Sequence, residues 1–126
     1  MTGTTAEIRA YWSRLAPLGC IACSQDAEIA HCHGGSMQDL GYTKTKGKKQ
    51  PWMDWLVLPI CPTHHRWAPF SLDKSVTAFE SRFGRQVDWL DVMVIRLGVD
   101  VWKKMRAAHP NAWLPSDQQI DYRRAP

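Results

Sequence analysis

Hydrophobic residues recur at helical spacing in three stretches, one before and two after a middle segment with a different pattern. The three apolar stripes are Ile8, Tyr11, Trp12 and Leu15; Leu72, Val76, Phe79 and Phe83; and Val87, Leu90, Val94, Leu97 and Val101. Ser71 precedes the second stripe and Gly84 follows it, which predicts a helix between these two residues. Gly98 falls inside the third stripe, where it either kinks or ends the helix. We expect the stripes to pack into the core.

The middle segment has the pattern of two short strands. In residues 27–33, AEIAHCH, alternation places Ile29, His31 and His33 on one face of a strand, and two glycines end it. Residues 54–61, DWLVLPIC, form a second apolar run rich in branched side chains. The segment therefore predicts a β-hairpin with histidines at the end of its first strand.

A short helix is expected directly after the second strand. Pro62 suits a first helical turn that carries His64 and His65, and Pro69 stops it. The predicted order is strand, long loop, strand, helix. Together with the flanking stripes, this order predicts an α+β fold with a small ββα core between helices.

The loop between the two strands, residues 36–53, is rich in lysine. Lys44, Lys46, Lys48 and Lys49 cluster around a glycine. Lysines this dense suit contacts with nucleic-acid phosphates, and they equally suit a solvated loop that keeps the protein soluble. Both interpretations stay open.

Composition and length indicate one ordinary domain. The 126 residues are 44% hydrophobic and 22% charged, which is globular rather than disordered. We expect a domain over residues 1–108 and a loosely packed extension over 109–126. The net charge of +4 permits a polyanionic partner without requiring one. With no signal-peptide pattern and no apolar run near the ~20 residues of a membrane span, we expect a cytoplasmic protein.

Cysteine and histidine occur in two knuckles with metal-ligand spacing. Cys20 and Cys23 form C-x2-C, and Cys61 and His64 form C-x2-H. In a reducing cytosol, four such ligands favour a tetrahedral structural Zn²⁺ over disulfides. The alternatives are buried free cysteines beside an unrelated histidine, or a redox C-x2-C. The redox motif would need a strand–helix context, which the proline-flanked APLGCIACSQ does not offer.

The stretches LGCIAC, AEIAHCHGG, KGKKQPWMDWLVLPICPTHHR and FESRFG, within residues 18–84, together resemble one family. It is that of the HNH, or ββα-metal, nucleases of bacteriophages, and in particular the RecA-dependent nucleases of the Ref type. The resemblance implies a phage-encoded, metal-dependent DNA endonuclease working in recombination, in the host cytoplasm, with a recombinase filament as a further partner.

The resemblance also assigns roles. It implies that Cys20, Cys23, Cys61 and His64 hold the structural zinc and that His31 is the general base. It implies that His65 holds a catalytic Mg²⁺ or Mn²⁺.

Two positions depart from the family pattern. A metal ligand that usually precedes the general base falls at Ala30, which cannot coordinate an ion, and His33 would substitute for it. Asp54 matches the polar residue that opens the second strand in the family and is the other candidate to help His65 hold the metal. A further histidine is usual after the double histidine, but residues 67–70, WAPF, occupy that region. His31 and His33, with Cys32, could instead be further zinc ligands or simply packed. The chain is therefore interpreted as an HNH-type endonuclease, or alternatively as a non-catalytic zinc module that binds DNA or protein.

Overall fold

The computed structural model describes residues 4–39 and 51–108, which form a two-stranded sheet, five α-helices and three short helical turns. The elements in chain order are α1 (Thr4–Leu15), η1 (Ala16–Leu18), β1 (Glu28–His31), α2 (Gly35–Asp39), η2 (Pro51–Trp55), β2 (Val57–Ile60), η3 (Thr63–Trp67), α3 (Val76–Phe83), α4 (Gln86–Leu97) and α5 (Val101–Ala108). The loop residues Lys44, Lys46, Lys48 and Lys49 and the predicted extension 109–126 lie outside the described residues.

The two predicted strands form one antiparallel pair. Residues Glu28 to His31 oppose Ile60 to Val57 in register. Both strands are shorter than expected. The second begins three residues later than Asp54, which lies instead in the 3₁₀ turn η2, because a backbone hydrogen bond from Leu56 to Met53 closes that turn before the strand starts.

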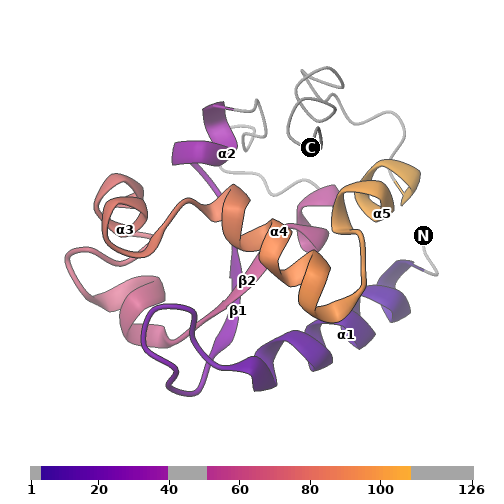
Figure 1. Ribbon diagram of the computed structural model, residues 1–126, viewed down its shortest axis with the longest axis horizontal. Helices are drawn as coiled ribbons and strands as arrows, with labels where there is room; N and C mark the ends of the chain where they lie inside the picture. The colour runs from indigo at the N-terminus through magenta and orange to yellow at the C-terminus, as the bar shows by residue number, and fades with distance from the viewer. Residues whose placement is uncertain (1–3, 40–50, 109–126) are drawn as a thin grey trace.

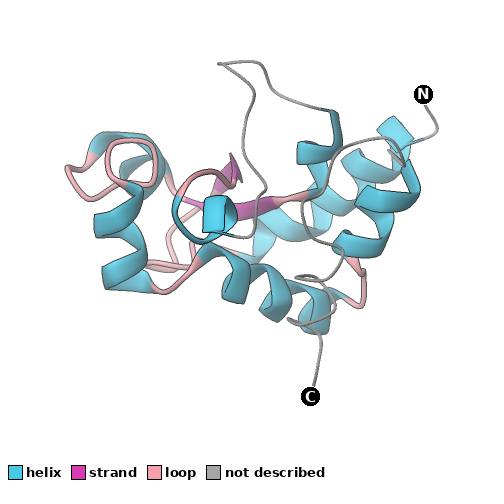
Figure 2. Ribbon diagram, turned by 90° about the horizontal axis from the view of Figure 1, so that it is seen from above, coloured by secondary structure: helices cyan, strands magenta, loops and turns pink. Residues whose placement is uncertain are grey.

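The sheet lies in the middle of the molecule with helices around it (Figure 2). Every residue of β2 is buried, and α4 packs across it in the view of Figure 1, while α5 contacts η2. The indole of Trp102 in α5 donates a hydrogen bond to Asp91 in α4 at 3.0 Å, which ties the last two helices together. No helix in these described ranges has both the length and the apolar character to cross a bilayer.

The second apolar stripe is a shorter helix than predicted. α3 begins at Val76 rather than at Ser71, and the hydroxyl of Ser75 caps it by accepting a hydrogen bond from the N–H of Ala78 at 3.2 Å. The preceding residues are held elsewhere, because the N–H groups of residues 72 and 73 donate to the carbonyls of residues 64 and 65 in η3. Because of these two hydrogen bonds, residues 72 and 73 lie against η3, which carries the double histidine, and are not part of α3.

The third stripe is divided between two helices. Gly98 has φ 71° and ψ 20°, the left-handed conformation that commonly ends a helix, and its N–H donates to the carbonyl of Val94. Val101 therefore begins α5 instead of continuing α4. The short helix expected after Pro62 is a π-type turn, η3, in which the N–H of Ala68 donates to the carbonyl of Thr63.

Two glycines with positive φ allow a matched test of backbone packing. An added Cβ at Gly35 would lie 2.6 Å from both Val76 and Glu80, whereas one at Gly98 would meet nothing within 4 Å. We expect Gly98→Ala to lower the free energy of unfolding by about 1–2 kcal/mol through the left-handed backbone alone. Gly35→Ala should cost about 1–3 kcal/mol more, because the methyl group also displaces a branched side chain. Urea unfolding of the metal-loaded variants measures both, and equal losses would contradict the close approach at Gly35.

Candidate metal centre and active site

The two knuckles meet in space. One ligand atom from each of Cys20, Cys23, Cys61 and His64 can be chosen so that all four lie within 4.8 Å of one another. Cys23 Sγ lies 3.6 Å from Cys61 Sγ, and Cys61 Sγ lies 3.2 Å from His64 Nδ1. Zinc–thiolate bonds of ~2.3 Å in a tetrahedron separate sulfur atoms by ~3.8 Å, so the spacing suits such an ion. This Cys₃His group could bind a metal such as zinc.

The first knuckle is a tight turn fixed to the second strand. The N–H of Cys20 donates to the carbonyl of Gln25, and the N–H of Ser24 donates back to the carbonyl of Cys20. The N–H of Ile21 donates to the carbonyl of Pro59 in β2 at 3.1 Å. The knuckle therefore lies beside the strand whose end leads into the second knuckle.

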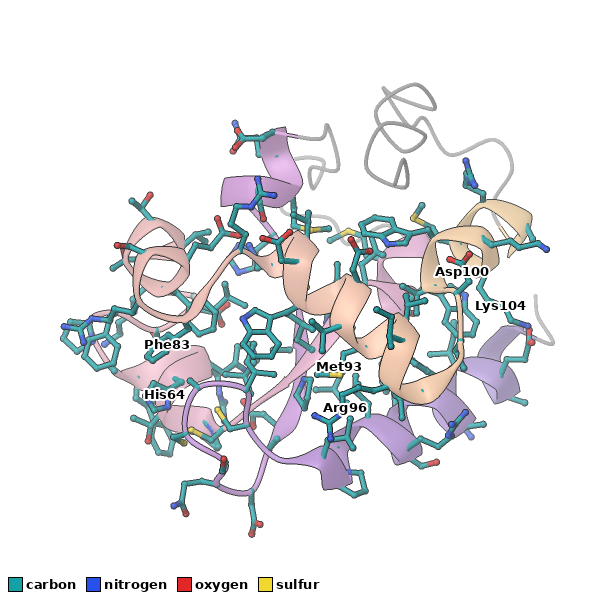
Figure 3. The ribbon with its side chains drawn as sticks, viewed as in Figure 1. His64, Phe83, Met93, Arg96, Asp100 and Lys104 are labelled. Atoms are coloured by element: carbon teal, nitrogen blue, oxygen red, sulfur yellow. The ribbon has the colours of Figure 1, made fainter. Side chains whose placement is uncertain are left out.

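The second knuckle is held by aromatic packing as well as by the backbone. Cys61 follows β2 directly, and His64 lies in η3. The His64 ring meets the ring of Phe83 edge-on at a centroid distance of 5.1 Å and lies 5.8 Å from that of Phe70; Figure 3 shows His64 and Phe83 as neighbours. These contacts restrict the imidazole so that Nδ1 stays beside the sulfur atoms.

The thiol of Cys61 differs from that of Cys32, the cysteine outside this group. All four cysteines are free of disulfides. Burial raises the pKa of the Cys61 thiol, but hydrogen bonds from the backbone and side chain of His64 and from the two neighbouring thiols lower it overall to about 7. By contrast, burial and then the charge of Glu80 raise the pKa of Cys32 far above its usual range. Cys32 is buried in the core and is not part of the metal-binding group.

His31 pairs with Asp54. Its Nε2 lies 2.9 Å from Asp54 Oδ1, and the two side chains are about one-quarter exposed. Trp12 in α1 supports this pair in two ways: its indole N–H donates to the backbone carbonyl of Asp54 at 2.9 Å, and its ring meets the His31 ring edge-on at 6.0 Å. Asp54, which the sequence suggests as a candidate metal ligand, therefore contacts His31, the candidate general base.

His65 is held by two carboxylates. Its Nδ1 lies 2.6 Å from Glu28 Oε2, and its Nε2 lies 3.5 Å from Asp73 Oδ2. Arg66 also contacts Glu28, with Nε 2.9 Å from Oε2. The His65 side chain is only 14% exposed, so these contacts largely determine its orientation.

Asp73 joins His65 to His33. Its Oδ1 lies 3.0 Å from His33 Nε2, while its Oδ2 faces His65. Sequence reasoning missed both Asp73 and Glu28. The signal for Glu28 was the strand register, which places it opposite Ile60, next to the second knuckle. Asp73 had been assigned to the predicted helix after Ser71, so its attachment to η3 was not foreseen.

A network of partly buried polar groups fixes the backbone at His33. The carboxylate of Glu80 accepts hydrogen bonds from the Ser36 hydroxyl at 2.6 Å and from the backbone and side chain of Gln86 at 2.9 and 3.0 Å. The Gln86 amide in turn accepts from the N–H of His33 and donates to its carbonyl, both at 2.9 Å. Gln86 is fully buried, so this clamp fixes where the backbone leaves β1.

The fold and the site define the class of protein, and a comparison with known families then assigns the family. Fold and side chains define a small α+β protein with a Cys₃His group that could bind a metal. A sequence profile described as "recombination enhancement, RecA-dependent nuclease" matches residues 4–98. The chain therefore belongs to this family of nucleases that function in recombination and, as an enzyme, is expected to hydrolyse DNA. Neither a curated protein nor a solved structure matches the chain.

The family match is longer than the stretch that carried the resemblance. It extends beyond residues 18–84 to include α1 and α4. Those two helices supply Trp12, which contacts the His31–Asp54 pair, and Gln86, which clamps His33.

Metal content tests the Cys₃His group. We expect about one tightly held Zn²⁺ per chain, and we expect Cys20→Ala to unfold the domain or strongly destabilise it, because the free energy of metal binding contributes to folding. Elemental analysis and thermal unfolding with and without a chelator measure the two effects. Cys32→Ala is the matched control: it should retain the ion and lose only core packing. Full zinc content in folded Cys20→Ala would contradict the assignment.

The pH dependence of stability tests the Glu80 network. Burial raises the pKa of Glu80, but hydrogen bonds from Ser36 and Gln86 outweigh it and lower the pKa overall. A lowered pKa means that ionised Glu80 stabilises the fold above its unfolded pKa of ~4.3 and that this contribution is lost as the pH falls through the folded pKa. We expect Glu80→Gln to cost about 2 kcal/mol at pH 7.

The difference between wild type and Glu80→Gln should shrink below about pH 4.3, and it is measured by urea unfolding along a pH series. Glu7→Gln, which removes an exposed ion pair with Lys104, is the control and should cost under about 1 kcal/mol. Equal losses in the two variants at pH 7 would contradict the role of Glu80.

Proposed function

We propose that the protein is a metal-dependent HNH-type endonuclease that hydrolyses phosphodiester bonds in DNA and uses the Cys₃His group to hold a structural Zn²⁺. β1, β2 and η3 form the ββα-like core of this proposal. We further propose that it is phage-encoded and acts in the host cytoplasm, with a recombinase filament as its partner.

The observation that carries the proposal is the His31–Asp54 pair at the end of β1. The Asp54 carboxylate, 2.9 Å from Nε2, favours the tautomer with its proton on Nε2. Nδ1 then carries the lone pair that takes a proton from the attacking water, a step to which the imidazole side chain is well suited. The Asp54 carboxylate also stabilises the imidazolium that results. Trp12 keeps the His31 ring and the Asp54 residue next to each other, because it contacts both.

The histidine and carboxylate side chains around η3 suit the second requirement, a divalent cation. Bound Mg²⁺ or Mn²⁺ would stabilise charge on the phosphate and on the leaving oxygen. His65 is the first candidate to hold it, with His33 as its partner, since Asp54 already contacts His31. The loop lysines 44, 46, 48 and 49 are proposed to contact the DNA backbone without reading bases.

A non-catalytic zinc module that binds DNA or another protein is the second candidate function. Ala30 favours it, because it stands where the family places a metal ligand and is fully buried against the core. A protein that has lost this ligand could retain the fold and the DNA surface without cleaving.

Plasmid nicking distinguishes the two candidates. We expect the zinc-loaded protein with Mg²⁺ or Mn²⁺ to nick supercoiled plasmid, with or without a recombinase filament on the DNA. His31→Ala should lower the rate by about 100-fold or more, because a general base contributes ~10²–10⁴-fold. His109→Ala, which changes the one histidine of the sequence to which no role is assigned, controls for loss of a histidine.

Nicking that survives His31→Ala would remove His31 from the mechanism. If the plasmid stays intact under every metal and filament condition while the protein retains DNA in a salt-sensitive manner, the non-catalytic module is the better description.

A further inference from the structure

We propose that Asp73 is a metal ligand in this chain and that it forms, with His33 and His65, a two-histidine, one-carboxylate site for a divalent transition ion. This inference rests on the proposed function for the purpose of the ion, but the binding site itself is argued from geometry. The types of ligand atom also indicate which ion the site prefers.

To complete the catalytic metal site, the chain needs a ligand atom from a position that the family pattern does not use. Ala30 has no ligand atom, and its neighbour across the sheet is the buried Leu58, so this position faces the core. Asp54 is engaged with His31. Residues 67–70, after the double histidine, contain no carboxylate or imidazole.

Asp73 supplies that donor because of how the chain returns to η3. Its N–H donates to the carbonyl of His65 at 2.9 Å, which places its side chain beside the His65 ring. The two carboxylate oxygens then face two different imidazoles, at 3.0 Å for His33 and 3.5 Å for His65, each through Nε2. The carboxylate therefore lies between the two Nε2 atoms. One donor atom from each of the three residues does not fall within 4.8 Å of both others, as it does in the Cys₃His group, so binding of an ion would draw the two rings toward Asp73.

The distances are compatible with an ion. Ligand atoms on adjacent corners of an octahedron with ~2.1 Å bonds are separated by ~3.0 Å. The His33–Asp73 separation matches this value, and the His65–Asp73 separation exceeds it by a few tenths of an ångström. The Asp73 side chain is 44% exposed and has room to adjust.

The His65 imidazole is also oriented as a metal ligand usually is. A histidine that binds a metal through one nitrogen typically donates its other N–H to a carboxylate or carbonyl. Glu28 occupies Nδ1 of His65 at 2.6 Å, which directs Nε2 toward Asp73. The backbone of His33 is held by the Gln86 amide. An ion pair that only fastens the loop would not require a carboxylate on the far side of the His65 ring.

The donor types indicate the preferred ion. Imidazole nitrogen binds Mn²⁺, Co²⁺ and Ni²⁺ better than Mg²⁺, which favours oxygen ligands. We therefore expect the site to bind Mn²⁺ more tightly than Mg²⁺.

The experiment titrates Mn²⁺ into the zinc-loaded full chain. Free Mn²⁺ is followed by electron paramagnetic resonance and binding heat by calorimetry. We expect one saturable site, with affinity reduced at least about 10-fold in Asp73→Asn and in His65→Ala. Asp54→Asn should bind Mn²⁺ as the wild type does, although we expect it to nick more slowly. Asp88→Asn, which removes an exposed aspartate paired with Arg85, is the matched control for charge. Zinc content and thermal unfolding show that each variant is folded.

A second measurement keeps the test valid if Asp73→Asn does not fold. In the wild type, substoichiometric Mn²⁺ should broaden the amide NMR signals of Asp73, His33 and His65 before that of Asp88. Signals that broaden uniformly would overturn the site.

The outcomes separate this inference from the proposed function. Unchanged Mn²⁺ affinity in Asp73→Asn, with loss in His65→Ala, would overturn the role of Asp73 and leave metal-dependent cleavage intact. No saturable Mn²⁺ site in the wild type would also overturn it, even if plasmid is nicked. Mn²⁺ binding that requires Asp73, in a protein that never cleaves DNA, would support the site and refute the nuclease.

Discussion

Convergence of the two knuckles on one point is the constraint on which the rest of the structure depends. The sheet has only two strands of four residues, and an isolated pair of this size is at best marginally stable in water. A metal held by Cys20 and Cys23 on one side and by Cys61 and His64 on the other would fasten the segment before β1 to the segment after β2. The backbone bond from Ile21 to Pro59 acts at the same junction. The hairpin is thus restrained at the end where η3 leaves it, and α4 packs against β2.

The turn η3 transfers this restraint to the candidate active site. His64 and His65 are adjacent, but their rings have different surroundings: His64 faces the cysteines and two phenylalanines, and His65 faces Glu28 and Asp73. Because the two residues are adjacent, the contacts that restrict the His64 ring also restrict the backbone of His65. The same turn accepts the backbone bonds of residues 72 and 73 through its carbonyls, so the position of Asp73 follows from that of the metal group. Structural stability and ligand geometry are coupled here through a single turn.

Short-range patterns made some of these features predictable and others not. The four ligands of the Cys₃His group could be predicted because each x2 knuckle is local and the chemistry of sulfur and imidazole restricts what they do. The first strand was recognisable from alternation and the second from its apolar, branched side chains, although the ends of both strands were not. Asp54 was assigned to a strand and lies in a 3₁₀ turn, since one local hydrogen bond decided the boundary. Asp73 could not be foreseen, because its place depends on tertiary hydrogen bonds to η3 that override the helical spacing of Leu72 and Val76. Glu28 required the strand register, which sequence spacing alone does not give.

The departures at the site are consistent with the packing around them. A ligand at position 30 would lie on the core side of β1, since Ala30 and Cys32 are buried while His31 and His33 are partly exposed. Two positions further on, His33 projects from a backbone that Gln86 and Glu80 hold through hydrogen bonds, none of which involves a residue of the Cys₃His group. A donor can therefore move from position 30 to position 33 without disturbing the core, provided that a second donor approaches from the opposite side. The loop after η3 brings Asp73 to that side, because its attachment to the turn leaves the carboxylate between the two imidazoles.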